Sequence, residues 1–200
     1  MRWVVLLVRV PAEPSRHRVA VWRELRRLGA VSIGQSAWAL PATAGSAAGI
    51  ERVNELVDRG AGELTVLEAT AADQASAARL ERAWTDAREA EWAEFRAECA
   101  RYLAELDKEV ATGKLTAAEL EEEDQSMERL RRWHRELRLR DALGAPSATQ
   151  ADQDLKQCEA QLADYTDRVF RALKRGLTRQ PRSITASPPP PQGGRSAPAA

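Results

Sequence analysis

The sequence predicts an α+β protein in which a small sheet unit is followed by a bundle of long helices. Over residues 1–70, short apolar runs alternate with amphipathic segments and with glycine or proline, which is typical of strands and helices in turn. After Thr70 the apolar residues recur at spacings of three and four, the period of a helix. The chain has 200 residues, enough to bury a core without disulfides. We therefore expect a sheet-containing domain at residues 1–71 and a helical domain at residues 72–176.

The first unit is expected to begin with a buried strand and a helix. Trp3–Val10 is almost continuously apolar, which indicates a strand covered on both faces. Ser15 is the expected N-cap of the following helix, which places Val21 and Leu25 on one face. Gly29 is expected to end this helix.

Two short strands, a second helix and a last strand complete this unit. Ala30–Ile33 and Ser36–Leu40 predict a hairpin, Ala47–Arg59 predicts a helix, and Glu63–Ala69 predicts an alternating strand. The order βαββαβ is that of the ferredoxin-like fold, one antiparallel sheet with both helices on one face.

Three helices are expected after the sheet unit. The first is Asp73–Ala111. The second begins at the capping box Thr116–Glu119 and runs to about Leu143. The third runs from about Thr149 to Gly176. Narrow apolar seams of this kind predict a three-helix bundle. The seam residues are Trp92, Phe95, Cys99, Tyr102 and Leu106; Leu120, Met127, Leu130 and Leu137; and Leu155, Cys158, Leu162, Tyr165 and Val169. Residues 177–200 hold four consecutive prolines and predict a disordered tail.

Little in the sequence points to catalysis, a metal or a cofactor. His17 and His134 each lie among arginines on the expected surface of a helix, and no nucleophile stands beside a local base motif. Cys99 and Cys158 are far apart, so we expect two reduced, buried thiols. The segment Gly45–Gly49 lacks a phosphate-loop lysine and is expected to be a flexible turn. We expect a protein that is not an enzyme.

We expect a cytoplasmic protein that does not cross a membrane. The formal net charge is zero, but an acidic segment at 71–125 precedes a basic one at 126–182. The acidic stretch Glu119–Ser126 is expected to be a solvated helix start, because carboxylates suit that end of the helix dipole. The longest apolar run, Trp3–Val8, is too short to cross a bilayer, which takes about 20 residues.

Two arginine-rich helices are the informative feature. Arg129–Arg140 holds six arginines in twelve residues. Arginine suits bidentate contacts with phosphates and other oxyanions. The candidate DNA-binding or oxyanion-binding residues are Arg16, Arg18, Arg23, Arg26 and Arg27 on the first helix and Arg131, Arg132, Arg135 and Arg138 on the later one. The alternatives are solvent exposure for the first set and, for the second, ion pairing with the acidic helix at 73–111.

Two stretches resemble a known family. "WVVLLVRVPAEPSRHRVAVWRELRRLGAV", with the following "WALP", resembles the opening of the ChrB N-terminal domain of chromate-resistance regulators. "KLTAAELEEEDQSMERLRRWHRELRLRDALGAP" resembles the helical segment of that family. The resemblance covers roughly residues 1–173 and implies a DNA-binding transcriptional regulator of a chromate efflux operon. The first unit is also similar to a domain of the phenylacetate-responsive repressors and to the Cas2 fold, which implies a homodimer.

Full-length members of this family carry a second, C-terminal domain, whereas this chain stops in the proline-rich tail. The resemblance therefore implies either binding without chromate sensing or a sensor on a separate polypeptide. Three hypotheses stay open: a DNA-binding regulator, a module that binds chromate or another oxyanion, and a helical module that binds a partner protein.

Overall fold

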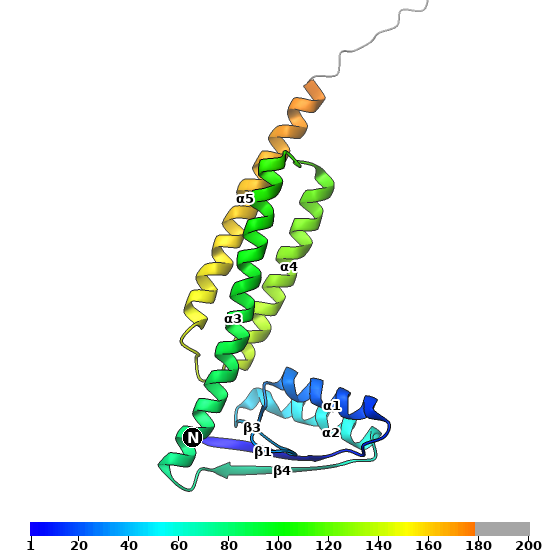
Figure 1. Ribbon diagram of the computed structural model, residues 1–200, viewed down its shortest axis with the longest axis vertical. Coiled ribbons are helices and arrows are strands. Elements are labelled where there is room, and N and C mark those ends of the chain that lie inside the picture. Colours follow the sequence, from blue (N-terminus) through cyan, green and yellow to red (C-terminus); the bar gives the residue numbers. More distant parts are fainter. Residues whose placement is uncertain (179–200) are drawn as a thin grey trace, which may run out of the picture.

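The computed structural model describes residues 1–178 and confirms an α+β protein whose sheet unit precedes three long helices (Figure 1). The predicted tail lies outside the described residues except at its start. The elements in chain order are β1 (Arg2–Arg9), α1 (Ser15–Leu28), β2 (Val31–Ser32), β3 (Ala37–Pro41), the 3₁₀ turn η1 (Ala44–Ser46), α2 (Ala47–Arg59), β4 (Glu63–Thr70), α3 (Gln74–Thr112), α4 (Ala117–Arg140) and α5 (Ala148–Thr178).

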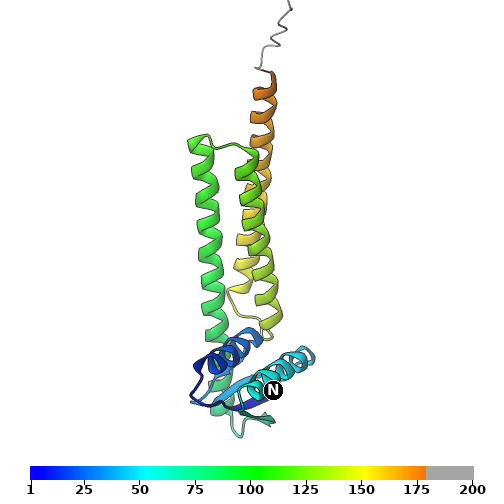
Figure 2. The same cartoon turned by 90° about the vertical axis from the view of Figure 1, so that its right-hand side faces the viewer.

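The four strands form one antiparallel sheet in the order β2-β3-β1-β4. Leu6 at the centre of β1 lies opposite Trp38 on β3 and Val66 on β4. Both α1 and α2 lie on the same side of the sheet (Figure 2), where Val21 of α1 and Val53 of α2 are buried against it. Burial of this aliphatic layer is the main force that holds the helices to the sheet.

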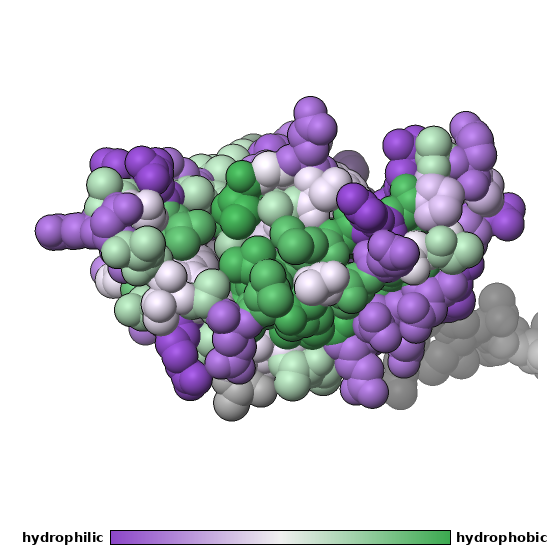
Figure 3. Space-filling view, turned by 90° about the horizontal axis from the view of Figure 1, so that it is seen from below, coloured by the Kyte–Doolittle hydropathy of each residue, from purple (hydrophilic) through white to green (hydrophobic). Residues whose placement is uncertain are grey.

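The other face of the sheet is only partly covered. The first turns of α3 bring Trp84 onto Trp3, with ring centroids 6.3 Å apart and an interplanar angle of 72°. Farther along the same face, Leu7 and Leu67 remain 42% and 46% exposed. Figure 3 shows hydrophobic residues gathered on this side of the molecule, with hydrophilic residues around them.

The three predicted seams meet in the core of the helical bundle. Trp92, Phe95 and Leu106 of α3, Met127 of α4 and Cys158 of α5 are fully buried there. Asp73 caps α3 by accepting a hydrogen bond from the amide of Ser76 at 2.6 Å, and the Thr116 hydroxyl accepts one from the amide of Glu119 at 3.2 Å. The capping prediction for α4 is therefore confirmed.

Several predicted helix ends were wrong. Pro14, rather than Ser15, occupies the N-cap position of α1, and no side chain caps that helix. The second bundle helix ends at Arg140 instead of near Leu143, because the Asp141 carboxylate accepts hydrogen bonds from the next backbone amides, including that of Ala145 at 2.9 Å. The third helix continues through Gly176, since one glycine weakens a helix by only about 1 kcal/mol.

The segment Gly45–Gly49 is not the flexible turn that was predicted. Its first residues form the 3₁₀ turn η1, and its last three belong to α2. Gly49 is buried, and a Cβ atom there would lie 2.3 Å from Cδ1 of Leu28, so glycine lets α1 and α2 approach closely. In the part of the chain that the structure describes, no helix has both the length and the apolar character of a membrane span.

Candidate anion-binding surface

The arginines of α1 point away from the sheet because the apolar stripe of this helix points toward it. All five candidates on α1 are exposed. Arg27 donates from Nε to Glu24 at 2.9 Å, and Arg52 of α2 donates to the same carboxylate at 3.1 Å. The hydrogen bond from Arg27 is the main cause of a lowered pKa of Glu24. Glu24 therefore joins α1 to α2, and Arg27 is occupied.

The other α1 arginines are not held by carboxylates. The Arg26 guanidinium lies 5.9 Å from the ring centroid of Trp22, a cation–π contact. Within residues 1–178, the side chains of Arg16, Arg18 and Arg23 make no hydrogen bond or ion pair. These groups are available to an external anion.

Two of the four candidate arginines on α4 form ion pairs within the protein. Arg131 donates from Nε to Glu159 at 2.9 Å, and Arg138 donates to Asp152 at 2.9 Å. Both carboxylates belong to α5, rather than to the acidic helix at 73–111 that this alternative named. The hydrogen bond to Glu159, together with one to Glu128, raises the pKa of Arg131.

Arg132 and Arg135 are the available arginines of α4. They lie one turn apart on the exposed side of the helix, and their side chains make no hydrogen bond or ion pair with the described residues. A guanidinium that already bonds a carboxylate must exchange that partner to take up an anion, whereas these two need not.

The structure brings the ends of α1 and α4 together (Figures 1 and 2). A Cβ atom at Gly29, just after α1, would lie 3.3 Å from Cβ of Arg140 at the end of α4. The charge of Glu136 contributes to a raised pKa of Arg27, after the larger effect of Glu24, so the two helices are electrostatically linked. We call the available arginines near this junction the basic corner: Arg23, Arg26, Arg132 and Arg135. Arg16 and Arg18, at the other end of α1, lie apart from it.

A buried arginine of α3 fixes this junction. Arg88 is 2% exposed, donates from Nη1 to the carbonyl of Gly29 at 2.9 Å, and donates from Nη2 to Glu91 at 3.0 Å. Its guanidinium lies 4.5 Å from the ring centroid of Trp84, and burial lowers its pKa. Sequence reasoning missed Arg88, although its spacing of four residues from both Trp84 and Trp92 places it on the apolar seam of α3.

His134 is not the surface histidine that was predicted. Its side chain is 16% exposed, its Nε2 lies 2.7 Å from Asp152 Oδ1, and its ring packs 5.5 Å from those of Trp92 and Phe95. Asp152 thus ties both His134 and Arg138 to α5. His17 is also half-buried, beside Gly60. The histidines therefore belong to the packing of the molecule.

The acidic stretch of α4 is not fully solvated. Glu123 is buried, and burial, followed by the charges of Glu109 and Glu105, raises its pKa to about 7. It lines a cavity of about 460 Å³ between α3 and α4, together with Tyr102 and Trp133. The prediction of a solvated helix start holds only for the exposed carboxylates beside Glu123.

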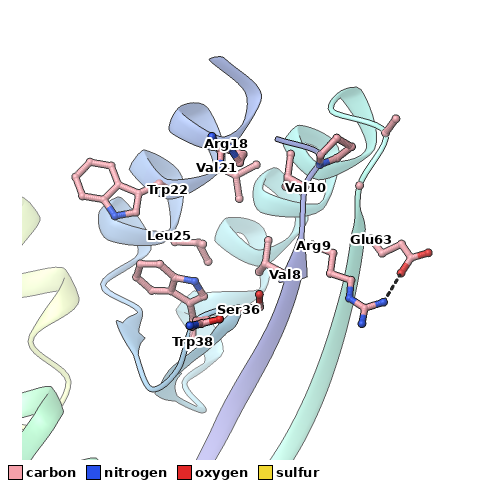
Figure 4. A pocket seen from close by; sticks show the side chains of 14 residues that line it. Val8, Arg9, Val10, Arg18, Val21, Trp22, Leu25, Ser36, Trp38 and Glu63 are labelled. Atoms are coloured by element: carbon pink, nitrogen blue, oxygen red, sulfur yellow. Dashed lines mark ion pairs between the residues drawn. The ribbon is translucent and has the colours of Figure 1, made fainter. Parts of the chain in front are cut away.

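A second cavity, of about 590 Å³, opens beside α1 (Figure 4). Val8 and Leu25 contribute to its apolar wall, and Trp22 and Trp38 lie on one side. Arg18 is the one candidate arginine that lines it. A doubly charged oxyanion needs several donors, and of the two arginines that line this cavity Arg9 is paired with Glu63, which leaves Arg18.

The cysteines are confirmed as buried free thiols. Cys158 Sγ lies 3.6 Å from the carbonyl oxygen of Cys99 in the bundle core. Among the described residues, no group of three or more His, Cys, Asp or Glu side chains has the arrangement of a metal site.

Comparison with known proteins agrees with the resemblance seen in the sequence. A family model described as "Protein ChrB, N-terminal" matches residues 18–176. Searches of curated proteins and of solved structures found no match. Because the family model covers most of the chain, the protein belongs to the ChrB N-terminal family, which connects it with chromate resistance.

Proposed function

We propose that this protein is a non-enzymatic, cytoplasmic regulator of chromate resistance that binds duplex DNA through the basic corner and acts as a homodimer. The observation that carries the DNA contact is the set of four arginines, on two helices whose C-terminal ends meet, that no carboxylate of residues 1–178 neutralises. Membership in the ChrB N-terminal family supplies the setting of chromate resistance. We also assign residues 1–71 to the ferredoxin-like class as one domain, since its elements and strand order match that plan, and residues 72–176 to a second domain.

The spacing of the arginines suits a phosphate backbone. Arg23 and Arg26 lie three residues apart on α1, as do Arg132 and Arg135 on α4, which is about 4.5 Å along each helix. Duplex DNA carries one charge about every 1.7 Å of its axis, so a stripe of this length faces several phosphates. Such contacts give affinity and orientation but little choice of sequence. Two copies in a dimer add the spacing between sites as a further restraint.

The test measures fluorescence anisotropy of the full chain with its own upstream duplex and with a scrambled duplex. The double variant Arg132→Ala/Arg135→Ala removes two available guanidiniums without breaking an ion pair. We expect it to weaken binding by at least about tenfold, the loss of two phosphate contacts. Arg131 and Arg138 are unsuitable for this purpose, because their loss would remove contacts between α4 and α5.

The control matched in charge is Arg168→Ala/Arg171→Ala, two exposed arginines on α5 whose ion pairs with Asp164 and Asp167 lie at the surface and contribute little to stability. It should leave the affinity nearly unchanged. Equal effects of the two double variants would contradict the assignment of the basic corner, and the absence of binding at low salt would contradict DNA binding altogether. Repeating the titration with chromate shows whether this chain senses it: release by chromate indicates a self-contained sensor, and unchanged binding places the sensor elsewhere.

The oxyanion-binding alternative has weaker support. The arginines of the basic corner lie on exposed helix surface, and the cavity beside α1 contains a single candidate arginine. A thermal shift with chromate that disappears in Arg132→Ala/Arg135→Ala would favour this alternative through ligand linkage.

A further inference from the structure

The carboxylate of Glu123 is buried without a counter-ion. Glu123 is 7% exposed, although it lies in the acidic first half of α4. Among residues 1–178 its carboxylate has no hydrogen-bond or ion-pair partner, since the Tyr102 hydroxyl donates instead to the backbone carbonyl of Glu123, at 3.2 Å. Buried carboxylates are almost always paired or hydrogen-bonded, because an isolated charge in a protein interior is costly. An unpartnered one therefore indicates a place where a group from outside the chain can bind.

Glu123 lines the cavity of about 460 Å³ between α3 and α4, which are neighbours in the helical bundle (Figure 1). We call it the Glu123 cavity. Tyr102 and Leu130 are buried residues of its wall, and Trp133 is a third wall residue. Trp133 packs edge to face on Phe95, with ring centroids 5.5 Å apart, which holds the indole in place. A cavity of this size, with aromatic and apolar wall residues and one unpaired charge, suits a small organic molecule.

The other carboxylates of the Glu123 cavity already have cations beside them. The charged residues that line the cavity are Glu98, Glu105, Glu123, Arg101 and Arg129. Glu98 pairs with Arg101. Glu105 accepts a hydrogen bond from Lys108 at 2.7 Å. Arg129 donates to the Ser126 hydroxyl at 2.8 Å, and it lies about 9 Å along the helix from Glu123. Glu123 is therefore the carboxylate of this cavity that a bound cation would neutralise.

The surroundings of Glu123 favour a positive group. Burial raises the pKa of Glu123 to about 7, and four further carboxylates add to this effect through their charge: Glu109 and Glu105 on α3, and Glu119 and Glu122 on α4. The same negative charges attract a cation to this position. Aromatic rings also attract cations to their faces. An ammonium group on an apolar body can use the carboxylate and the rings together, whereas Ca²⁺ and Mg²⁺ bind through several oxygens.

We propose that the Glu123 cavity binds a small organic ammonium, whose charged nitrogen bonds the Glu123 carboxylate and whose apolar body lies against Tyr102 and Trp133. A primary ammonium carries three donors, so it can bond the carboxylate and keep a further bond to water at the mouth of the cavity. This site goes beyond the proposed function. It shares no residue with the basic corner, and its test needs no DNA.

The test uses phenethylamine as the probe and 2-phenylethanol as its matched control, in which a hydroxyl replaces the ammonium on the same body. NMR titration of the full chain at pH 8, up to about 10 mM of either molecule, covers weak affinities. We expect the amine to bind with a dissociation constant of about 1 mM or tighter and the alcohol to bind at least about tenfold more weakly. Equal affinities, or no saturable shift with the amine, would overturn the proposal.

Glu123→Gln removes the charge and keeps the size of the side chain, and circular dichroism checks that the variant is folded. Its affinity for phenethylamine should fall at least about tenfold, because a neutral amide replaces a charged acceptor. Glu122→Gln, at an exposed neighbouring position, removes the same charge outside the cavity and should bind the amine nearly as the wild type does. Unchanged affinity in Glu123→Gln would show that the carboxylate does not hold the amine.

The pH dependence of the wild type gives a second readout that needs no variant. The amine stays protonated below about pH 9, whereas Glu123 ionises near pH 7. The affinity for phenethylamine should therefore rise about tenfold from pH 6 to pH 8, as the ionised fraction of Glu123 rises. The affinity for 2-phenylethanol should not rise. A flat profile for the amine would overturn the assignment of Glu123 as the group that bonds it.

Discussion

Glu123 is the residue whose environment differs most from what its neighbours suggest. It stands in a run of carboxylates, yet it is buried, and its pKa is raised from 4.5 to about 7. The unfolded chain ionises near 4.5, while the folded chain stays protonated until about 7. The free energy of unfolding that depends on Glu123 is therefore fully present below about pH 4.5 and is lost as the pH rises to about 7.

Glu123→Gln should remove this loss, because the amide stays neutral. We expect the variant to gain about 1 to 2 kcal/mol relative to the wild type between pH 5 and pH 8, measured by urea unfolding. The full shift corresponds to about 3 kcal/mol, but the cavity beside Glu123 admits water and reduces the effect. Glu122→Gln, at an exposed neighbouring position, is the control and should follow the wild type. Parallel pH curves for Glu123→Gln and the wild type would contradict the raised pKa.

Arg88, unlike Glu123, is a buried cation that has hydrogen-bond partners. Arg88→Leu removes hydrogen bonds to the buried Gly29 carbonyl and to Glu91, whose side chain is 12% exposed. We expect a loss of about 2 to 3 kcal/mol in the free energy of unfolding. Arg82→Leu, on the exposed side of the same helix, should cost less than about 0.5 kcal/mol. Equal costs in thermal melts would show that the junction does not depend on Arg88.

At the scale of elements, the turn between α2 and β4 depends on a close backbone contact. A Cβ atom at Gly62 would lie 2.3 Å from the backbone oxygen of Arg9, so the end of β1 would have to move. We expect Gly62→Ala to lower the free energy of unfolding by about 1 to 3 kcal/mol in chemical denaturation. Gly45→Ala, where no atom lies within 4 Å of the added carbon, should be close to neutral. A neutral Gly62→Ala would show that the strand shifts without cost.

The elements were predictable where local rules decide them. The seams of α3, α4 and α5 follow from apolar spacing, and the start of α4 follows from the capping box at Thr116. The end of α4 was not predictable, because the carboxylate of Asp141 turns the chain by binding backbone amides before the glycine and proline are reached. The partners of Arg131 and Arg138 also escaped prediction, since periodicity shows which residues share a face but not which helix lies opposite.

At the scale of the whole molecule, the sequence placed the arginines on two helices but not beside each other. Their junction depends on Arg88 and on the approach of Arg140 to Gly29, two contacts between segments far apart in the chain. The uncovered part of the sheet was equally hidden, because Trp3–Val10 reads as buried on both faces while α3 covers only its beginning. Long-range packing decided both features, and local patterns do not encode it.

The salt dependence of DNA binding tests the central claim most directly. For each phosphate that a protein neutralises, the plot of log affinity against log salt steepens by about 0.9. Between about 50 and about 200 mM salt, the wild type should lose affinity steeply, and Arg132→Ala/Arg135→Ala should have a slope smaller by about 1.8. A slope identical in both proteins would contradict a role of these arginines at the phosphates, and with it the basic corner as the DNA-binding surface.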